Sequence, residues 1–315
     1  MNLLVTGGAG FIGSNFVRNQ ALCSDKWESI TVIDALTYAG NLENIQDLLD
    51  KDAIKFVKGS INDISLIDDV MREKDIVVNF AAESHVDKSI EMPIKFMETN
   101  ALGVVNLLRA SIANRISTFV QISTDEVYGS ILVGSWDENS PLDPSSPYSA
   151  SKASGDLACM SFYKTFGLDV RITRCSNNYG PRQYPEKLIP NFITRLLKGE
   201  TVPIYGRGEN IRDWLHVEDH CQGIERVIEH GKPGNIYNIG GGSELSNIEL
   251  TLKLIDAFGL DDSYICFIDD RKGHDFRYSL NYDKARQELG YSPKVDFEKG
   301  LQSTIDWYLK KYKTI

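Results

Sequence analysis

Leu3-Leu4-Val5-Thr6-Gly7-Gly8-Ala9-Gly10-Phe11-Ile12-Gly13 opens the chain. An apolar run followed by three evenly spaced glycines predicts a strand, a tight turn and the start of a helix. Glycines at this spacing let a backbone approach a pyrophosphate and let the helix pack closely on its strand. The candidate cofactor-binding residues of this stretch are Gly7, Gly10, Phe11, Ile12 and Gly13. The spacing differs from G-x-G-x-x-G, so its context must support it.

That context is a second strand, Ile30 to Ile33, which ends in Asp34. An acidic residue about 20 positions after the last glycine accepts hydrogen bonds from the adenosine ribose. Its charge also repels a 2′-phosphate, so the pattern predicts NAD in preference to NADP. The alternative is a glycine turn followed by an unrelated aspartate.

Further apolar runs alternate with helical patterns as far as about residue 180. We expect strands at 54–57, 75–82, 119–122 and 169–174, a return to the sheet near 236–240, and helices from Pro93 to about Arg109 and from Tyr148 to about Phe166. This alternation predicts an α/β fold with a Rossmann-type doubly wound parallel sheet. Residues 1–180 would form the NAD-binding domain, and residues 181–315 mainly a smaller, mixed substrate-binding domain.

Two segments follow the apolar run at 119–122 and carry most of the candidate chemistry: Ser123 to Gly129, and Tyr148 to Lys152. The carboxyl ends of parallel strands are where such sheets hold their ligands. Tyr148 and Lys152 are four residues apart, so they share a helix face. An ammonium and a helix N-terminus beside the phenol are expected to lower its pKa, which makes a tyrosine base. The alternatives are two surface residues and, for Asp125-Glu126, a solvated acidic turn.

The composition excludes several classes of protein. The chain has 315 residues, 42% of them hydrophobic, and a formal net charge of −10 with no basic stripe, which argues against nucleic acid as a partner. Its five scattered cysteines contain no Cys-x-x-Cys pair, so neither a disulfide framework nor a metal site is expected. With no signal-peptide or membrane-spanning pattern, we expect a cytoplasmic protein without a membrane partner.

Three further features bear on ligands. Asn177 and Asn178 follow a strand, where they could bind a polyhydroxylated ligand or cap a turn. Arg212 and Arg271 stand in loops of an acidic chain and fit a clamp for a second diphosphate better than surface charges. His85 is expected to be structural.

Taken together, these motifs resemble the extended short-chain dehydrogenase/reductase family over essentially the whole chain. Within it, Asp34 to Leu42, Ala81 to Asp87 and Thr124 to Gly129 are similar to nucleotide-sugar 4,6-dehydratases. The Thr-Asp-Glu run distinguishes them, because related epimerases lack the acid pair. The resemblance implies a hydro-lyase with NAD as cofactor and dTDP-glucose as substrate, acting in deoxysugar biosynthesis such as a rhamnose pathway.

The resemblance also implies residue roles. Tyr148 would be the base for the sugar 4-hydroxyl, Lys152 its helper, Thr124 a ligand of the 4-oxygen, Glu126 the base at C5 and Asp125 the acid at C6. Further cofactor contacts are implied at Thr37, Asp63, Ile64, Ala81, Ala82, Ser84, Thr99 and Asn178. Substrate contacts are implied at Ser84, Thr124, Asn177, Lys187, Leu188, Ile189, Pro190, Pro203, Ile204, Tyr205, Arg212, Asn247, Arg271 and His274.

The chain departs from the family pattern at Lys272, where the family has proline, and in its short connection from Asp125 to Tyr148. Relatives dimerise through a four-helix bundle, which here would use the helices at about 93–112 and 148–166. Their outward residues would be Ile94, Met97, Ala101, Leu108, Leu157 and Phe162, and the alternative is that these residues belong to the core. The alternatives are a 4-epimerase, dehydratase or decarboxylase acting on a UDP-, CDP- or GDP-sugar, and a silent NAD-sensing regulator.

Overall fold

The computed structural model describes residues 1–270 and 273–313. Its larger sheet has seven parallel strands in the order β10-β6-β5-β4-β1-β2-β3. These strands are β1 (Asn2–Thr6), β2 (Ser29–Asp34), β3 (Lys55–Lys58), β4 (Ile76–Asn79), β5 (Thr118–Thr124), β6 (Val170–Cys175) and β10 (Asn235–Ile239). The strand order reverses between β1 and β4, so the sheet has a topological switch point there. The predicted doubly wound fold is confirmed.

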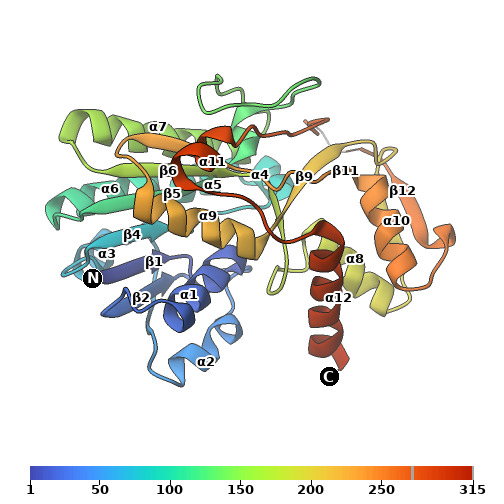
Figure 1. The fold of residues 1–315 in the computed structure, drawn as a ribbon, viewed down its shortest axis with the longest axis horizontal. Helices are drawn as coiled ribbons and strands as arrows, with labels where there is room; N and C mark the ends of the chain where they lie inside the picture. Colours follow the sequence, from blue (N-terminus) through green and yellow to red (C-terminus); the bar gives the residue numbers. More distant parts are fainter. Residues whose placement is uncertain (271–272, 314–315) are drawn as a thin grey trace.

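Helices cover both faces of this sheet (Figure 1). On one face, the side chains of Leu3 and Val5 pack with α1 (Phe11–Cys23) and α9 (Val217–His230). On the other face, Leu4 packs with helices that include α6 (Gly103–Ala113) and α7 (Pro147–Phe166). Successive side chains of a strand point to opposite faces, which is why consecutive apolar residues serve two cores. Shorter elements complete this part: η1 (Leu42–Asn44), α2 (Gln46–Leu49), α3 (Ile64–Val70) and α4 (Val86–Glu91).

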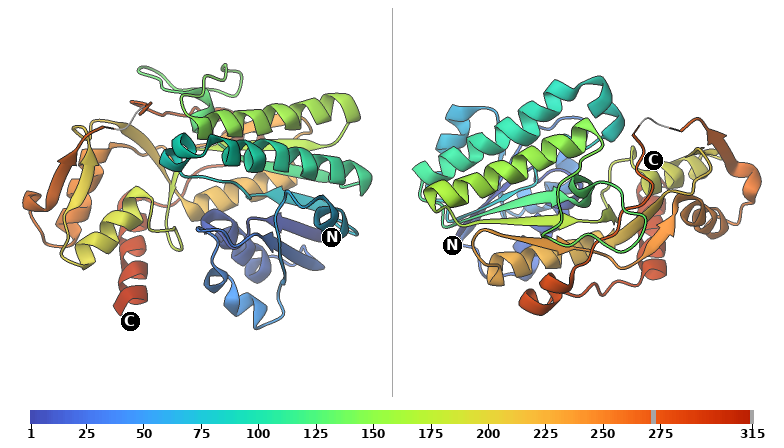
Figure 2. Two further views of the ribbon diagram at one scale, coloured as in Figure 1. Left: turned by 180° about the vertical axis from the view of Figure 1, so that it is seen from behind. Right: turned by 90° about the horizontal axis from the view of Figure 1, so that it is seen from above.

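The helix predicted from Pro93 to about Arg109 is interrupted. It consists of α5 (Pro93–Met97), a π-helical turn η2 (Glu98–Leu102) and α6, and it lies beside α7 (Figure 2). The turn η2 carries the buried Asn100, whose amide donates to Ser151 Oγ and to Glu83 O, each at 2.9 Å. Of the two alternatives for Leu108, the outer face or the core, the structure shows the core, where the residue is fully buried.

A smaller lobe is built from the C-terminal half. It contains a mixed three-stranded sheet, β11-β9-β7, and a parallel pair, β12-β8. The strands are β7 (Asn177–Tyr179), β8 (Val202–Tyr205), β9 (Ile211–His216), β11 (Glu244–Ser246) and β12 (Ile265–Ile268). Its helices are α8 (Leu188–Leu197), α10 (Asn247–Ala257), η4 (Asp262–Tyr264) and α12 (Phe297–Lys313). A third apolar core joins α8, α10 and α12 to β8.

The C-terminal half does not belong to this lobe alone. Helix α9 and α11 (Asp283–Leu289) pack against the larger sheet, where Ile224 and Leu289 enter its core. Helix α10 has no counterpart in the sequence prediction. It begins with a capping box in which Ser246 and Glu249 exchange hydrogen bonds, a motif that the Ser-x-x-Glu spacing could have revealed.

No helix in residues 1–270 or 273–313 is long and apolar enough to cross a membrane. Over the same residues, no cluster of three histidine, cysteine or acidic side chains is arranged to hold a metal ion.

Candidate functional site

A cavity of about 440 Å³ lies at the carboxyl edge of the parallel sheet, across its switch point. It is bordered by the ends of β1, β2, β4 and β5, by the first turns of α7, and by residues 175–178 and 183–187. Nearly all predicted cofactor residues meet here, together with part of the predicted substrate set. From the cofactor set these are Gly7, Gly10, Phe11, Ile12, Gly13, Asp34, Thr37, Ala81, Ala82, Ser84, Thr99, Tyr148, Lys152 and Asn178, and from the remaining catalytic and substrate sets Thr124, Asp125, Glu126, Asn177 and Lys187.

The glycine turn leaves no room for side chains. Gly7 has φ +68°, and a Cβ there would lie 2.6 Å from the backbone nitrogen of Ala81. A Cβ on Gly13 would collide with the Gly7 carbonyl oxygen, so the start of α1 can approach its strand only because that residue is glycine. The result is an open backbone surface at a helix N-terminus, which suits a pyrophosphate.

Asp34 closes the other end of this surface. Its carboxylate accepts hydrogen bonds from the backbone nitrogens of Ala9 at 3.0 Å and Leu36 at 2.8 Å. Burial raises the pKa of Asp34, and these two hydrogen bonds oppose the rise. The carboxylate is thus held at the rim of the cavity with acceptor capacity left for ribose hydroxyls. Glycine cradle and fixed carboxylate together fit a dinucleotide.

Asp63 and Ile64 do not line the cavity. The Asp63 carboxylate caps α3 by accepting from the backbone nitrogen of Leu66 at 3.1 Å, and Ile64 is exposed. The wall where they were expected is formed by the preceding residues Gly59, Ser60, Ile61 and Asn62.

Tyr148 and Lys152 project from α7 into the cavity, as predicted from their spacing. A capping box between Ser146 and Ser149 holds the first turn of this helix. The predicted lowering of the Tyr148 pKa is wrong for the protein by itself: burial, followed by the Glu126 charge, raises the pKa well above its usual value. The Lys152 ammonium donates to the Ile122 carbonyl oxygen at 2.6 Å, and this hydrogen bond fixes the position of its charge.

Asp125 and Glu126 lie in a short 3₁₀ turn, η3 (Asp125–Tyr128), directly after β5. Thr124 caps this turn by accepting from the Glu126 backbone nitrogen at 3.3 Å. Asp125 is 3% exposed, and its Oδ2 atom has no hydrogen-bond partner among the described residues. Burial, then the charges of Glu126 and Asp213, raise the pKa of Asp125 well above its usual value. Two adjacent carboxyl groups therefore differ in burial: Asp125 is enclosed, whereas Glu126 is half-buried at the cavity wall.

Asn177 and Asn178 both border the cavity, but they differ in their contacts. Asn177 Oδ1 is buried without a hydrogen-bond partner among the described residues, so it can accept from a ligand. Asn178 Oδ1 lies 2.9 Å from Nδ1 of His220, and burial lowers the pKa of that histidine to about 3. The neutral ring then donates to the amide and fixes the orientation of Asn178.

Several lining residues were not predicted. Glu83 is buried and pairs with Lys95 at 2.8 Å, and both border the cavity. Tyr184, which also lines it, packs its ring edge-on against Tyr38, with the centroids 5.8 Å apart. These residues adjoin predicted ones in the sequence, but their pairing depends on tertiary contacts that the sequence does not show.

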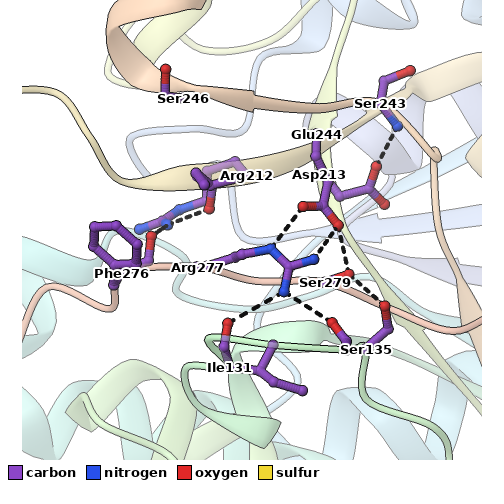
Figure 3. A network of polar contacts seen from close by, with 12 residues as sticks. Ile131, Ser135, Arg212, Asp213, Ser243, Glu244, Ser246, Phe276, Arg277 and Ser279 are labelled. Atoms are coloured by element: carbon purple, nitrogen blue, oxygen red, sulfur yellow. Dashed lines mark hydrogen bonds and ion pairs between the residues drawn. The ribbon is translucent and has the colours of Figure 1, made fainter.

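Arg212 lies in the smaller lobe, on β9 (Figure 3). It is 5% exposed and donates to the backbone oxygens of Ile211 and Asp275 at 2.7 and 2.9 Å, with its guanidinium stacked over the Tyr278 ring. Its charge also acts on Asp125, whose pKa it lowers against the larger effect of burial. Arg212 is thus rigidly placed near the acid turn, although it does not border the main cavity.

The other predicted substrate residues lie farther from the main cavity. Ile189 and Ile204 are core residues, which leaves their backbones but not their side chains for a ligand. Tyr205 meets the His274 ring edge-on at 6.0 Å, and His274 Nδ1 lies 2.7 Å from Asp270 Oδ1. Leu188, Pro190, Pro203 and Asn247 flank these positions on α8, β8 and α10. Arg271 and Lys272 lie outside the described residues.

The chain was compared with known proteins. The family described as GDP-mannose 4,6 dehydratase matches residues 4–304. A dTDP-glucose 4,6-dehydratase of Streptomyces antibioticus is 54% identical over 312 residues, which cover 98% of this chain and 92% of that protein.

Solved structures agree with this match. The dTDP-glucose 4,6-dehydratase DesIV of Streptomyces venezuelae, described with NAD and TYD bound, superposes with a TM-score of 0.97 at 51% identity and covers 100% of this chain and 98% of its own. A UDP-glucose 4-epimerase of Thermotoga maritima reaches a TM-score of 0.92 at 32% identity, covering 99% of this chain and 100% of its own. The epimerase structures are 27–32% identical to this chain, whereas the curated dTDP-glucose 4,6-dehydratases are 43–54% identical. The chain belongs to the nucleotide-sugar 4,6-dehydratase family, in its dTDP-glucose 4,6-dehydratase group.

Proposed function

We propose that this protein converts dTDP-glucose into dTDP-4-dehydro-6-deoxy-glucose with NAD as a resident cofactor. The observation that carries the proposal is the acid turn: a buried carboxyl group with an unpartnered oxygen next to a second carboxyl group, both bordering the cavity that Tyr148 enters. A 4-epimerase needs no such acid pair. The high identity to dTDP-glucose 4,6-dehydratases supports the same assignment.

The residues of this chain divide the reaction between them. When bound, NAD⁺ supplies the acceptor for the C4 hydride and returns that hydride to C6. Tyr148 removes the proton of the 4-hydroxyl, and Thr124 orients the 4-oxygen. The buried Lys152 ammonium stabilises the phenolate electrostatically. Burial disfavours the charged phenolate, so that in the protein by itself the pKa of Tyr148 is still raised.

Once C4 is a ketone, the C5 proton becomes acidic. Glu126 removes it while Asp125 gives its proton to the C6 oxygen, which leaves as water. The raised pKa of Asp125 keeps this group protonated, and the neighbouring Glu126 charge adds to that effect. Burial therefore selects Asp125 as the acid and leaves the half-buried Glu126 as the base. Return of the hydride to C6 and of a proton to C5 completes the product.

The test is mass spectrometry of the products formed from dTDP-, UDP- and GDP-hexoses without added reductant. We expect loss of one water from dTDP-glucose and little conversion of the other two. A new product of unchanged mass, separated from the substrate by chromatography, would instead indicate epimerisation, and loss of water mainly from the UDP- or GDP-hexose would indicate a different dehydratase. Either outcome would contradict the proposal.

We further propose a homodimer through α5, α6 and α7. These helices present an apolar groove lined by Ile94, Met97, Leu102 and Ala158, with Ile94 72% exposed and Leu157 beside the groove 62% exposed. Contiguous apolar surface of this kind favours association. Light scattering should report twice the chain mass, and Ile94→Glu should yield monomers, whereas Leu252→Glu on α10 should not.

For the cellular setting, we propose the cytoplasm, where nucleotide sugars and NAD are available. The 4-keto-6-deoxy product would enter deoxysugar biosynthesis, of which a rhamnose pathway is one example.

A further inference from the structure

Asp156 and Arg174 form a buried ion pair that has no part in the proposed reaction. Asp156 Oδ2 accepts from Arg174 Nε at 2.9 Å, and the two residues are 1% and 3% exposed. Burying two charges is expensive unless their geometry is well satisfied. Such a pair, one helical turn from the cavity residue Lys152, therefore invites a functional explanation.

Asp156 stands one helical turn after Lys152 on α7, so both side chains leave the same face of the helix. Both also reach the same strand at adjacent residues: Lys152 donates to the Ile122 carbonyl, and the Ser123 hydroxyl donates to Asp156 Oδ2 at 3.0 Å. The ammonium and the carboxylate are therefore both held at the end of β5, by neighbouring residues of that strand.

Arg174 holds the carboxylate from the next strand. Ser123 and Arg174 are paired residues of β5 and β6, so both face α7 at the same level. The Arg174 guanidinium also stacks on the Tyr128 ring, at 4.7 Å from its centroid. It thereby contacts the acid turn, of which Tyr128 is the last residue. Asp156 keeps one oxygen, Oδ1, without a hydrogen-bond partner among the described residues. Ser123 and Arg174 thus position the carboxylate through Oδ2 and leave Oδ1 available as an acceptor.

We propose that Asp156 is a positioning residue for the reaction: its carboxylate, fixed by Ser123 and Arg174, keeps the Lys152 ammonium charged inside a buried site. This inference rests on the proposed function for its catalytic consequence but not for its electrostatic one.

The surroundings of Lys152 support this assignment. Burial lowers the pKa of Lys152, and Asp156 is the largest influence that raises it. The thiols of Cys159 and Cys175 also face Lys152, but burial raises their pKa values, so they are uncharged at neutral pH. The other titratable groups that border the cavity are Asp34, Glu83, Lys95, Glu98, Asp125, Glu126, Tyr148, Tyr184, Glu186 and Lys187.

The decisive variant is Asp156→Asn, which keeps the size of the side chain and an oxygen that accepts from Ser123 and Arg174. Without the negative charge, Lys152 should lose its proton at lower pH. We expect the midpoint for Lys152, followed through the ¹³Cε resonance of labelled lysine and assigned with Lys152→Gln, to fall by about one pH unit or more, a tenfold change in its ionisation constant.

Arg174→Gln provides a test of opposite sign. Removing the guanidinium leaves Asp156 to act on Lys152 uncompensated, so the midpoint should rise. If both variants moved the midpoint in the same direction, a general loosening of the site would explain the data and the proposal would be overturned. If Asp156→Asn melts at too low a temperature to be titrated, the direction of the shift in Arg174→Gln tests the proposal, and a fall of the Lys152 midpoint in that variant would overturn it.

The matched control is Asp169→Asn. Asp169 pairs with Arg171 at 2.7 Å at the opposite end of β6, away from the cavity. It should leave the Lys152 midpoint unchanged. An Asp156→Asn midpoint equal to that of wild type would also overturn the proposal.

The catalytic consequence is measured separately. In the loaded enzyme, absorbance at 340 nm reports the rate of C4 oxidation after mixing with dTDP-glucose. Because charged Lys152 is the active form, the alkaline limb of this rate should shift to lower pH in Asp156→Asn by the same amount as the midpoint. If wild type showed no reaction with dTDP-glucose, the proposed function would fail, while the lysine titration would still decide the role of Asp156.

Discussion

Tyr148 lies in the first turn of a 20-residue helix, whereas Asp125 lies in a 3₁₀ turn of four residues. The support of the base is mostly local: a capping box and successive turns of α7 hold Tyr148 and Lys152. The support of the acid comes from elsewhere in the chain. The hydroxyl of Tyr128 donates to Asn238 Oδ1 at 2.9 Å, and the backbone nitrogen of Asp143 donates to Val127 O at 3.1 Å.

The loop that follows the acid turn is likewise held by residues that are distant in the sequence (Figure 3). Arg277 donates through two nitrogens to Glu244 at 2.7 and 2.8 Å and through a third to Gly134 O at 2.9 Å. Three segments separated by more than 30 residues thus meet at one guanidinium. The base is thus supported mainly by its own helix, whereas the acid turn and the loop after it depend on contacts with distant parts of the chain. The predictions below test this division.

The largest effect is expected for Tyr148→Phe. Without the phenol, nothing takes the proton of the 4-hydroxyl, and C4 oxidation should slow by about 10³-fold. Stopped-flow absorbance at 340 nm measures this step. Tyr163→Phe, on the same helix, is the control and should stay within about twofold of wild type. A similar loss in both variants would remove Tyr148 from its role.

Asp125→Asn should act on the other half of the reaction. Oxidation should persist, but the C6 hydroxyl should leave about 10²-fold more slowly, because an amide cannot donate the proton effectively. Reduced nicotinamide should therefore accumulate on mixing with dTDP-glucose. Should dehydration continue at the wild-type rate, Asp125 is not the acid.

Arg277→Met tests the remote support. It removes the fork that joins the loop at 130–136 to Glu244, so we expect elimination to slow by several-fold while oxidation is unchanged. An Arg–carboxylate pair of this partly exposed kind contributes about 1 kcal/mol to stability, which a melting curve can detect. Arg286→Met, which removes the exposed pair with Asp283, is the control. Equal slowing of both steps would contradict the proposed division.

The smallest effect concerns stability and pH. The folded pKa of Asp125 is raised, so the folded state keeps a proton that the unfolded chain releases above its ordinary pKa of 3.8. Its contribution to stability is therefore present at low pH and is lost as pH rises toward the folded pKa. Asp125→Asn should remove this loss, and the melting temperature of the variant relative to wild type should increase between pH 4.5 and pH 8. A constant difference would show that Asp125 is not buried with a raised pKa.

The sequence predicted the parallel sheet, the glycine turn, Asp34, and the pairing of Tyr148 with Lys152 on one helix face. It also predicted that Asp125 and Glu126 follow a buried strand. These features depend on local spacing, which the chain carries in any fold. Residue spacing was not sufficient at two positions. Asp63 caps a helix and does not line the cavity, and Leu108, for which the outer face and the core were both open, is buried.

Residue spacing thus determined which groups could act together, because strand and helix periods are properties of the backbone. Tertiary structure decided which of two adjacent carboxyl groups is enclosed and has its pKa raised, since burial and the charges of Asp213 and Arg212 act on Asp125 from a strand almost 90 residues away. It also decided that Asp156 and Arg174, on α7 and β6, form a buried ion pair. Solvation and charge depend on distance in space, and the order of residues along the chain does not contain that distance.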